Sequence, residues 1–512
     1  MPLRFFLAAL LSLLVPGPGR TESAPAPALP EGVAPLPAES AQHFQELLAA
    51  AEKYRGLTAL RPVPAGTLEE PELRKKMAES LDEELSPDQL AAAEIAAKAF
   101  GLIPESMDLS RYLTELLTSE VAGFYDPLKD YMALVRRGEA VDEEDVVIVH
   151  ELTHALQDQH FDLQRFEAVD PMSDASTALT ALAEGDATLT MTSFLAGRQL
   201  EETPGIGEVM KSVLGDPEAL TASDAPGGAE LAKAPAWVRD SLLFGYVQGF
   251  SFCLEVRRAG GQKLLDYAFA TDPPRSSEQI LHPEKWLGKR DDPILLRWPD
   301  LAPALPGWRK VSSGETGEAT LQSLLRLHAK DRGKADAAAA GWGGDRFEVY
   351  ARAGRRVLVW WTEWDSEADA AEFQAAARGL GRGWRVDALS ARRIMVLRGD
   401  LDRPRRAAVR ARLAAAEAVK PANVGVDLKA VVGLAGVQNL EERVNYGQLS
   451  KTATAERQGA WRVPYRGRTR ESRCRNGWRS WSSSAAMRPW CACRRPALAC
   501  SAWRARRRAT TG

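Results

Sequence analysis

The stretch VVIVHELTHALQDQHF (residues 146–161) decides more about the fold than any other part of this 512-residue chain. On a helix, residues four positions apart share one face, so that His150 and His154 would point the same way. Uncharged residues surround the pair, which indicates a buried helix. Acids at 142–144 precede it, where the helix dipole favours negative charge. The sequence therefore predicts one long helix over residues 142–164.

Two imidazoles one helical turn apart are typical of a zinc site. Glu151 lies between them in the sequence and would project beside the metal. A zinc ion lowers the pKa of a water molecule that it binds, and Glu151 could then accept the proton as a general base. His150, His154 and Glu151 therefore predict a zinc-dependent hydrolase, against the alternative of a surface helix with stray histidines.

A catalytic zinc needs a third protein ligand. Residues 174–200 are rich in Ala, Thr and Leu and predict a second helix, which carries Glu184. His160 is the competitor, but a continuing helix would turn it away from the face of His154. Gly185 indicates a close backbone approach or a kink beside Glu184. We therefore expect Glu184 as the third ligand, the alternative being a solvated helix acid.

Four other polar residues are candidates for supporting roles. Tyr246 and His282 could each donate a hydrogen bond to a developing oxyanion, or could make structural hydrogen bonds instead. Asp158 and Asp186 could accept the outer N–H of a ligand histidine, or could be solvated charges. A strand–turn–strand pattern over 120–135 could offer its edge to an extended substrate peptide.

Several motifs resemble a family of predicted bacterial zinc metallopeptidases of the gluzincin type. The resemblance covers about residues 85–380, and the motifs that carry it are GFYDP (123–127), HELTHALQDQHFDL (150–163), ALAEGDA (181–187), SSEQILHPEKW (276–286), GWGGDR (341–346) and WDSEADAAEF (364–373). It implies a thermolysin-like active-site helix, with His150, His154 and Glu184 as zinc ligands and Glu151 as the base. Gly245 stands where the family is expected to have Pro, which we interpret as a local change of the backbone.

The predicted fold class is α+β. Residues 39–305 would form a mostly helical, thermolysin-like zinc-peptidase domain with a small β-hairpin or sheet, and 306–455 a smaller α+β domain. Within the first domain, 39–101 are expected to be helical throughout, with a helix beginning at Ser86-Pro87. A further helix is expected over 237–258, after a loop over 202–234, and 273–289 are expected to be irregular.

Composition is that of an ordinary globular protein, with 45% hydrophobic and 26% charged residues. The formal charge of −3 hides an asymmetry. Of the 66 Lys and Arg, 15 lie after residue 456, together with one of the 69 Asp and Glu, which leaves residues 1–456 with a charge of −17. Nucleic acid is therefore not expected as a partner of the acidic body.

Both ends of the chain have distinctive compositions. Residues 1–24 have a positive start, a short apolar run and a small-residue cleavage site, which predict a signal peptide and an exported, periplasmic or secreted protein without a further transmembrane segment. Residues 25–38 predict a Pro-rich linker. Residues 456–512 are rich in Arg, Trp and Cys. They indicate a disordered or frame-shifted end, against the alternative of a basic tail for nucleic acid or an anionic surface. Cys253 is the one cysteine before this tail.

The sequence thus favours an exported zinc metallopeptidase that acts on a peptide or protein substrate. Two alternatives stay open: a non-catalytic zinc-binding scaffold with the C-terminal domain as its interaction module, and a zinc hydrolase acting on a non-peptide bond. Glu151 separates the first alternative from an enzyme, because a purely structural zinc site has no need of a base.

Overall fold

The computed structural model describes residues 29–422, apart from 70, 73–74, 77–85, 121–122, 128, 138–139, 142–144, 168, 202, 204, 207–230 and 232, and also residue 431. The predicted signal peptide (1–24) and the basic tail (456–512) lie outside the described residues. So do most of the segment 71–85 and most of the loop predicted over 202–234.

The N-terminal region contains the helices α2 (Ala38–Arg55) and α4 (Pro87–Phe100), as the sequence predicts. The Ser86 side chain caps α4 by accepting a hydrogen bond from the Gln89 backbone amide, and the Gln89 side-chain oxygen accepts one from the Ser86 backbone amide. The expectation of helix throughout 39–101 is wrong at β2 (Ala65–Glu69). This strand pairs in parallel with a segment more than 60 residues away, and such a partner is invisible in a local pattern.

A five-stranded sheet follows the order β1-β2-β4-β3, with β5 paired to β4. The remaining strands are β1 (Ala34–Pro35), β3 (Gly123–Asp126), β4 (Tyr131–Arg137) and β5 (Ala140–Val141). The strands β3 and β4 form the predicted antiparallel hairpin, in which Tyr125 lies opposite Met132. The strand β1 comes from the segment predicted as a linker. In this sheet β3 is an edge strand.

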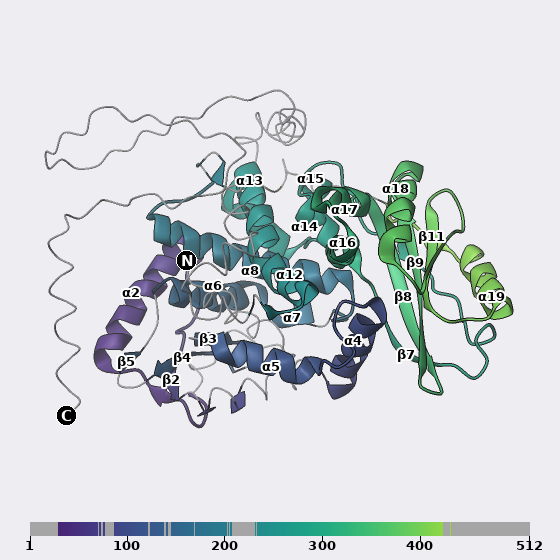
Figure 1. Cartoon of the computed structure of the whole chain (residues 1–512). Helices are drawn as coiled ribbons and strands as arrows, with labels where there is room; N and C mark the ends of the chain where they lie inside the picture. Colours follow the sequence, from purple (N-terminus) through teal and green to yellow (C-terminus); the bar gives the residue numbers. More distant parts are fainter. Residues whose placement is uncertain are drawn as a thin grey trace, which may run out of the picture. The chain divides into compact units, whose positions relative to one another are not determined.

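Two long helices, α6 (Asp145–Phe161) and α8 (Asp174–Ala196), lie side by side in the middle of the fold (Figure 1). They correspond to the two helices that the sequence predicts. Both are buried on nearly all sides, which is why neither shows an amphipathic pattern. The short helix α7 (Gln164–Glu167) and the turn at Ser173, whose side chain caps α8, connect them.

The helix predicted over 237–258 has three parts: α12 (Ala236–Phe244), the π-helical turn η2 (Gly245–Gly249) and α13 (Phe250–Ala270). The π-helical turn contains about one residue more than an α-helical turn. The spacing of hydrophobic residues in the sequence does not reveal such a local insertion. Residues Gly260 and Gly261 leave helical geometry inside α13, close to the predicted end of the helix. Two short helices, α14 (Ser277–Leu281) and α15 (Glu284–Leu287), occupy the segment expected to be irregular.

The C-terminal region is a five-stranded antiparallel sheet of order β10-β11-β9-β8-β7 with helices on both faces. Its strands are β7 (Arg309–Gly314), β8 (Trp342–Arg352), β9 (Arg355–Trp364), β10 (Trp384–Ala388) and β11 (Arg393–Gly399). Its helices are α16 (Gly317–His328), α17 (Arg332–Ala339), α18 (Glu367–Ala377), the 3-10 turn η3 (Arg378–Leu380) and α19 (Arg403–Ala414). A two-residue pair, β6 (Leu295–Leu296) with β12 (Ala418–Val419), completes it. The fold class is α+β, as predicted.

Side chains alternate between the two faces of this sheet, so that each face has its own apolar cluster. On β9, Trp361 packs with Val409 and Leu413 of α19. The neighbouring Trp360 faces the other way and meets Phe373 of α18 at 5.7 Å between ring centroids.

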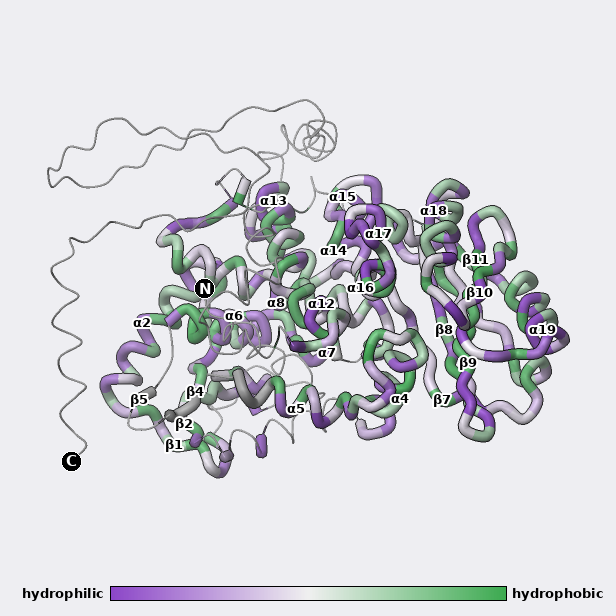
Figure 2. The backbone as a smooth tube through the Cα atoms, viewed as in Figure 1, coloured by the Kyte–Doolittle hydropathy of each residue, from purple (hydrophilic) through white to green (hydrophobic). Residues whose placement is uncertain are grey.

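The apolar core continues across the boundary predicted near residue 305. Phe100 of α4 contacts Phe347 and Trp360 edge to face, with ring centroids 5.1 Å and 5.2 Å apart. Figure 2 shows α4 in green over much of its length, as expected for a helix between two layers. Among the described helices, none is both long and apolar enough to cross a membrane.

Candidate metal centre

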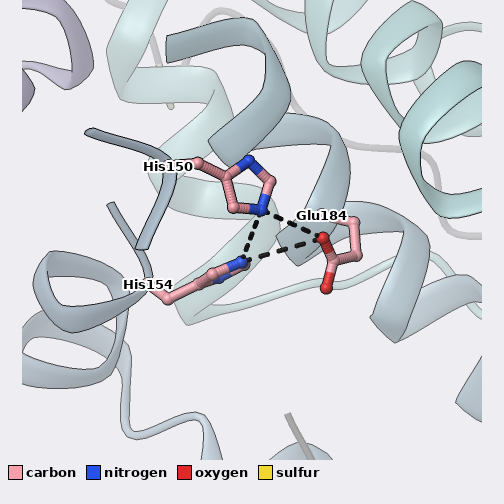
Figure 3. Close-up of side chains that lie close together, drawn as sticks. All are labelled: His150, His154 and Glu184. Atoms are coloured by element: carbon pink, nitrogen blue, oxygen red, sulfur yellow. Dashed lines mark hydrogen bonds and ion pairs between the residues drawn. The ribbon is translucent and has the colours of Figure 1, made fainter. Parts of the chain in front are cut away.

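The side chains of His150, His154 and Glu184 converge on one point between α6 and α8 (Figure 3). The Nε2 atoms of the two histidines are 3.1 Å apart. Glu184 Oε2 lies 3.3 Å from His150 Nε2 and 3.7 Å from His154 Nε2. These are the three residues that the sequence predicts as ligands, and the structure brings them together.

The spacing of the three atoms suits a zinc ion. Nitrogen and oxygen ligands lie about 2.0–2.2 Å from zinc, so tetrahedral ligand atoms are about 3.3 Å apart. The three distances lie on either side of this value. The Glu184 carboxylate is completely buried and faces the two imidazoles, and a buried carboxylate is costly unless a cation balances its charge. The donor set therefore fits zinc.

Burial and the neighbouring charges shift the three pKa values. Burial lowers the pKa of His150. Burial also disfavours the charged form of His154, but the Glu184 carboxylate outweighs it and raises the pKa of His154 to about 9. Burial would raise the pKa of Glu184, yet the charge of His154 and the two histidine hydrogen bonds hold it below the usual value. Without metal, His154 is therefore protonated at neutral pH and Glu184 is ionised. The positive charge of His154 then balances the Glu184 carboxylate in place of a metal ion.

The outer nitrogen of His154 is held by Gln157, not by an acid. His154 Nδ1 lies 3.0 Å from Gln157 Oε1, and the amide nitrogen of Gln157 donates to the Ala183 carbonyl and to Asp186 Oδ2. With Nδ1–H donating to Gln157, the His154 Nε2 lone pair faces Glu184 and the metal position. Asp186, expected as the acceptor from a ligand histidine, is one step further out.

A buried ion pair anchors the hydrogen-bonded series His154–Gln157–Asp186 at its Asp186 end. Arg55 of α2 has no exposed surface, and its Nε donates to Asp186 Oδ2 over 2.5 Å. Its NH1 donates to Asp266 Oδ1 over 2.8 Å. Since Gln157 and Arg55 share Asp186 Oδ2, the rotamer of the histidine-holding amide depends on a residue about 100 positions upstream.

Asp158, the other acid expected beside a ligand, belongs to a different network. It accepts hydrogen bonds from the Tyr125 hydroxyl and the Leu163 amide, at 3.0 Å and 3.1 Å. Burial raises its pKa to about 6. The Tyr125 oxygen also lies 2.8 Å from Asp130 Oδ1, so the single hydroxyl hydrogen is shared between the two carboxylates. Through this contact Asp158 secures β3 against α6.

Glu151, the expected base, is completely buried beside the ligands. Its Oε2 accepts a hydrogen bond from the backbone amide of Tyr125 over 3.0 Å. That amide belongs to the edge strand β3, so the outward edge of β3 faces Glu151. Glu151 and the strand edge predicted for substrate binding therefore lie next to each other.

Tyr246 lies on the π-helical turn with its ring stacked on His150, at 5.9 Å between ring centroids and 26° between planes. It is buried, and burial followed by the charges of Glu184 and Glu151 raises the pKa of its hydroxyl well above the usual value. The hydroxyl therefore stays protonated at neutral pH and is hydrogen-bonded with Glu184, so both alternatives for Tyr246, oxyanion donation and a structural hydrogen bond, stay open.

The structure gives His282 a different place. Its Nε2 lies 3.0 Å from Glu318 Oε1 on α16, and it meets none of the three ligands among the described contacts. The structural alternative weighed for His282 therefore describes it better than oxyanion binding. His160 is also apart from the ligands: its Nε2 lies 2.8 Å from the Thr58 carbonyl. It is not the third ligand in this arrangement.

Gly185 allows α8 to touch the π-helical turn. A Cβ atom at Gly185 would lie 2.1 Å from the carbonyl carbon of Gly249, and one at Gly249 would lie 2.0 Å from the Ala181 oxygen. The close backbone approach inferred from Gly185 is confirmed. It holds Tyr246 against the ligands.

A second acidic group consists of Glu278, Asp291 and Asp365. The Lys285 ammonium lies among them, at 2.5 Å, 3.2 Å and 2.7 Å from their carboxylate oxygens. Lys420 also pairs with Asp291 and Asp365, so each of the three carboxylates already has an ammonium partner.

Three residues of the site have no place in the sequence analysis: Gln157, Arg55 and Tyr125. Gln157 stands in the motif stretch itself, three residues after His154, where a helix brings the two side chains together. Arg55 and the Tyr125 amide come from distant segments, and no local pattern connects them with the zinc motif.

Comparison with known families gives one match, to a domain of unknown function (DUF8575), over residues 305–423. The match begins one residue before the predicted start of the C-terminal α+β domain and includes none of the candidate ligands. No curated protein and no solved structure matches the chain.

Proposed function

We propose that this protein is an exported zinc metallopeptidase of the gluzincin type, with a thermolysin-like arrangement of its active-site helices. His150, His154 and Glu184 would hold the zinc, and Glu151 would act as general base. One observation carries the proposal: within the described residues the cluster offers three ligands, with a buried carboxylate beside them. Structural zinc sites are closed by four protein ligands, whereas catalytic sites use three and keep one position open.

Zinc in this position would supply Lewis-acid polarisation of a water molecule and of the substrate carbonyl. Glu151 is placed to take a proton, because its carboxylate is buried next to the ligands and anchored by the Tyr125 amide. Tyr246 is placed to donate a hydrogen bond to an oxyanion, because its hydroxyl stays protonated beside Glu184.

The strand β3 is the edge of the sheet that would receive an extended peptide, although its residues are buried and its Tyr125 amide donates to Glu151. This edge strand lies directly against α6, and backbone addition to a strand edge is a common way of binding extended peptides. A scaffold with a structural zinc ion would require neither the edge strand nor a buried Glu151. This favours a peptide substrate over the two alternatives, the scaffold and the hydrolase of non-peptide bonds.

The test combines metal analysis with a broad peptide digest on the full chain. We expect about one zinc per chain. His154→Ala should lose the metal, and His160→Ala, which changes the same residue type on the same helix, should keep it. Glu151→Gln should keep zinc and lose hydrolysis by at least about a hundredfold. Stoichiometric zinc in His154→Ala, or unchanged turnover in Glu151→Gln, would contradict the assignment.

A further inference from the structure

A cavity of about 870 Å³ lies between α4, α5 (Leu109–Glu120), α8, α12 and α16. Its volume is in the range of about 300–1,000 Å³ that is usual for ligand sites. None of the three candidate ligands lines it, so it is a separate feature from the metal cluster. Its walls come both from the helical region and from the C-terminal region, through α16 and Phe347 of β8.

The walls differ in chemistry. One wall is apolar, and its side chains come from α4, α5 and α12: Leu90, Ala97, Phe100, Leu109, Leu113 and Phe244. The facing wall on α8 has a row of hydroxyl groups from Ser176, Thr177 and Thr180. These three hydroxyls have no protein hydrogen-bond partner in the described part of the chain.

The charged residues of the lining are mostly engaged with the protein. Asp240 accepts a hydrogen bond from Ser323, and Glu315 accepts one from the Asp174 amide. Arg326 donates to Asp336 over 2.5 Å. The lining groups that are available to a ligand are therefore apolar side chains and hydroxyl groups. Such a lining does not suit a highly charged ligand.

The cavity and the metal cluster lie along the same helix, α8. Thr177, Thr180 and Glu184 follow each other at helical spacing on one face, and the rise from Thr180 to Glu184 is about 6 Å. On the opposite wall, Gly245 lines the cavity and also meets Glu184: a methyl group added at Gly245 would lie 3.1 Å from Glu184 Cβ. A ligand in the cavity would therefore end beside the third metal ligand.

We propose that this cavity binds an apolar stretch of the peptide substrate next to the bond that is cut, with the C-terminal region providing part of its wall. The inference rests on the proposed function. A peptide suits the two walls, because its apolar side chains would meet α4 and α5 while its backbone groups need partners such as the α8 hydroxyls. An acyl chain would have no use for the hydroxyl row.

Binding is tested first, without hydrolysis, using the apolar probe 8-anilinonaphthalene-1-sulfonate. The full chain should bind it with a rise in fluorescence. Ala93→Trp, which fills the cavity from α4, should weaken binding by at least about tenfold. Ala91→Trp is the matched control, because Ala91 lies on the same helix, is exposed and does not line the cavity. Ala319→Trp, from the α16 wall, repeats the test if Ala93→Trp does not fold.

Displacement then identifies the ligand class. In Glu151→Gln, a Leu-rich peptide should displace the probe, and a Ser- and Gly-rich peptide of equal length should not. Displacement by laurate but not by the Leu-rich peptide would overturn the proposal in favour of an acyl ligand. Unchanged probe binding in both Ala93→Trp and Ala319→Trp would overturn it as well.

Hydrolysis separates this inference from the proposed function. If the unmodified chain binds the Leu-rich peptide in the cavity but cleaves no peptide, the proposed function fails and the apolar peptide site stands. If the chain cleaves Leu-rich and Ser- and Gly-rich peptides equally and Ala93→Trp changes neither rate, the peptidase stands and the substrate inference fails.

Discussion

Gly185→Ala tests the packing that holds the site together, because helix propensity and backbone contact predict opposite changes in the free energy of unfolding. Alanine favours a helix interior over glycine by about 1 kcal/mol, so helix propensity alone predicts a more stable protein. The structure predicts the reverse. Carbon atoms in contact lie about 3.5–4.0 Å apart, and the new Cβ would lie 2.1 Å from Gly249, so that α8 and the π-helical turn would have to separate by about 1.4 Å.

The expected loss follows from these two terms. Overpacking of a tight core costs about 1–3 kcal/mol, and backbone against backbone leaves no flexible side chain to yield, so the upper end applies. After the gain in helix propensity, the free energy of unfolding should fall by about 2 kcal/mol. Zinc affinity should fall as well, because Glu184 is the preceding residue on α8 and would move with it.

The assay is urea unfolding of the metal-free variants, with a zinc titration alongside. Gly379→Ala is the matched control, because Gly379 has no atom within 4 Å of the added Cβ, and it should leave both measurements unchanged. A Gly185→Ala protein as stable as the parent, or more stable, would refute the reasoning from backbone contact.

Three further outcomes are expected. At pH 7 zinc binding should release about one proton from His154, whose pKa is about 9 without metal, and the release should vanish as pH rises through 9; calorimetry in phosphate and in Tris buffer measures it. Gln157→Met should weaken zinc binding by about 10–100-fold in competition with a chelator while the fold is kept. Arg55→Met should cost about 3–5 kcal/mol of stability in urea unfolding, because it leaves Asp186 buried without its cation, and Arg55→Met/Asp186→Asn should recover most of that loss.

The sequence predicts those parts of the site that depend on local spacing. His150 and His154 meet because four residues make about one helical turn, and the cap at Ser86 follows from residue type. The position of Glu184 follows less directly, from a second buried helix with a glycine beside the acid.

The parts that the sequence does not predict depend on contacts between distant segments. Arg55 reaches Asp186 across 131 positions, and His282 finds Glu318 across 36. Both partners are ordinary charged residues in their own segments, so nothing in their local pattern marks them. The strand β2 is missed for the same reason, since its partner β4 is remote in the chain.

The triplet Glu184-Gly185-Asp186 shows why this site tolerates little change. The side chains of successive helix residues point about 100° apart, so three consecutive residues contact three different parts of the surroundings. Glu184 faces the two histidines, Gly185 touches the backbone of Gly249, and Asp186 joins Gln157 to Arg55. A shift of α8 therefore moves three things at once: the ligand Glu184, the contact of Gly185 with the turn that carries Tyr246, and Asp186, which accepts a hydrogen bond from Gln157. Substitutions at these positions should be strongly non-additive, because each one disturbs the surroundings of the other two.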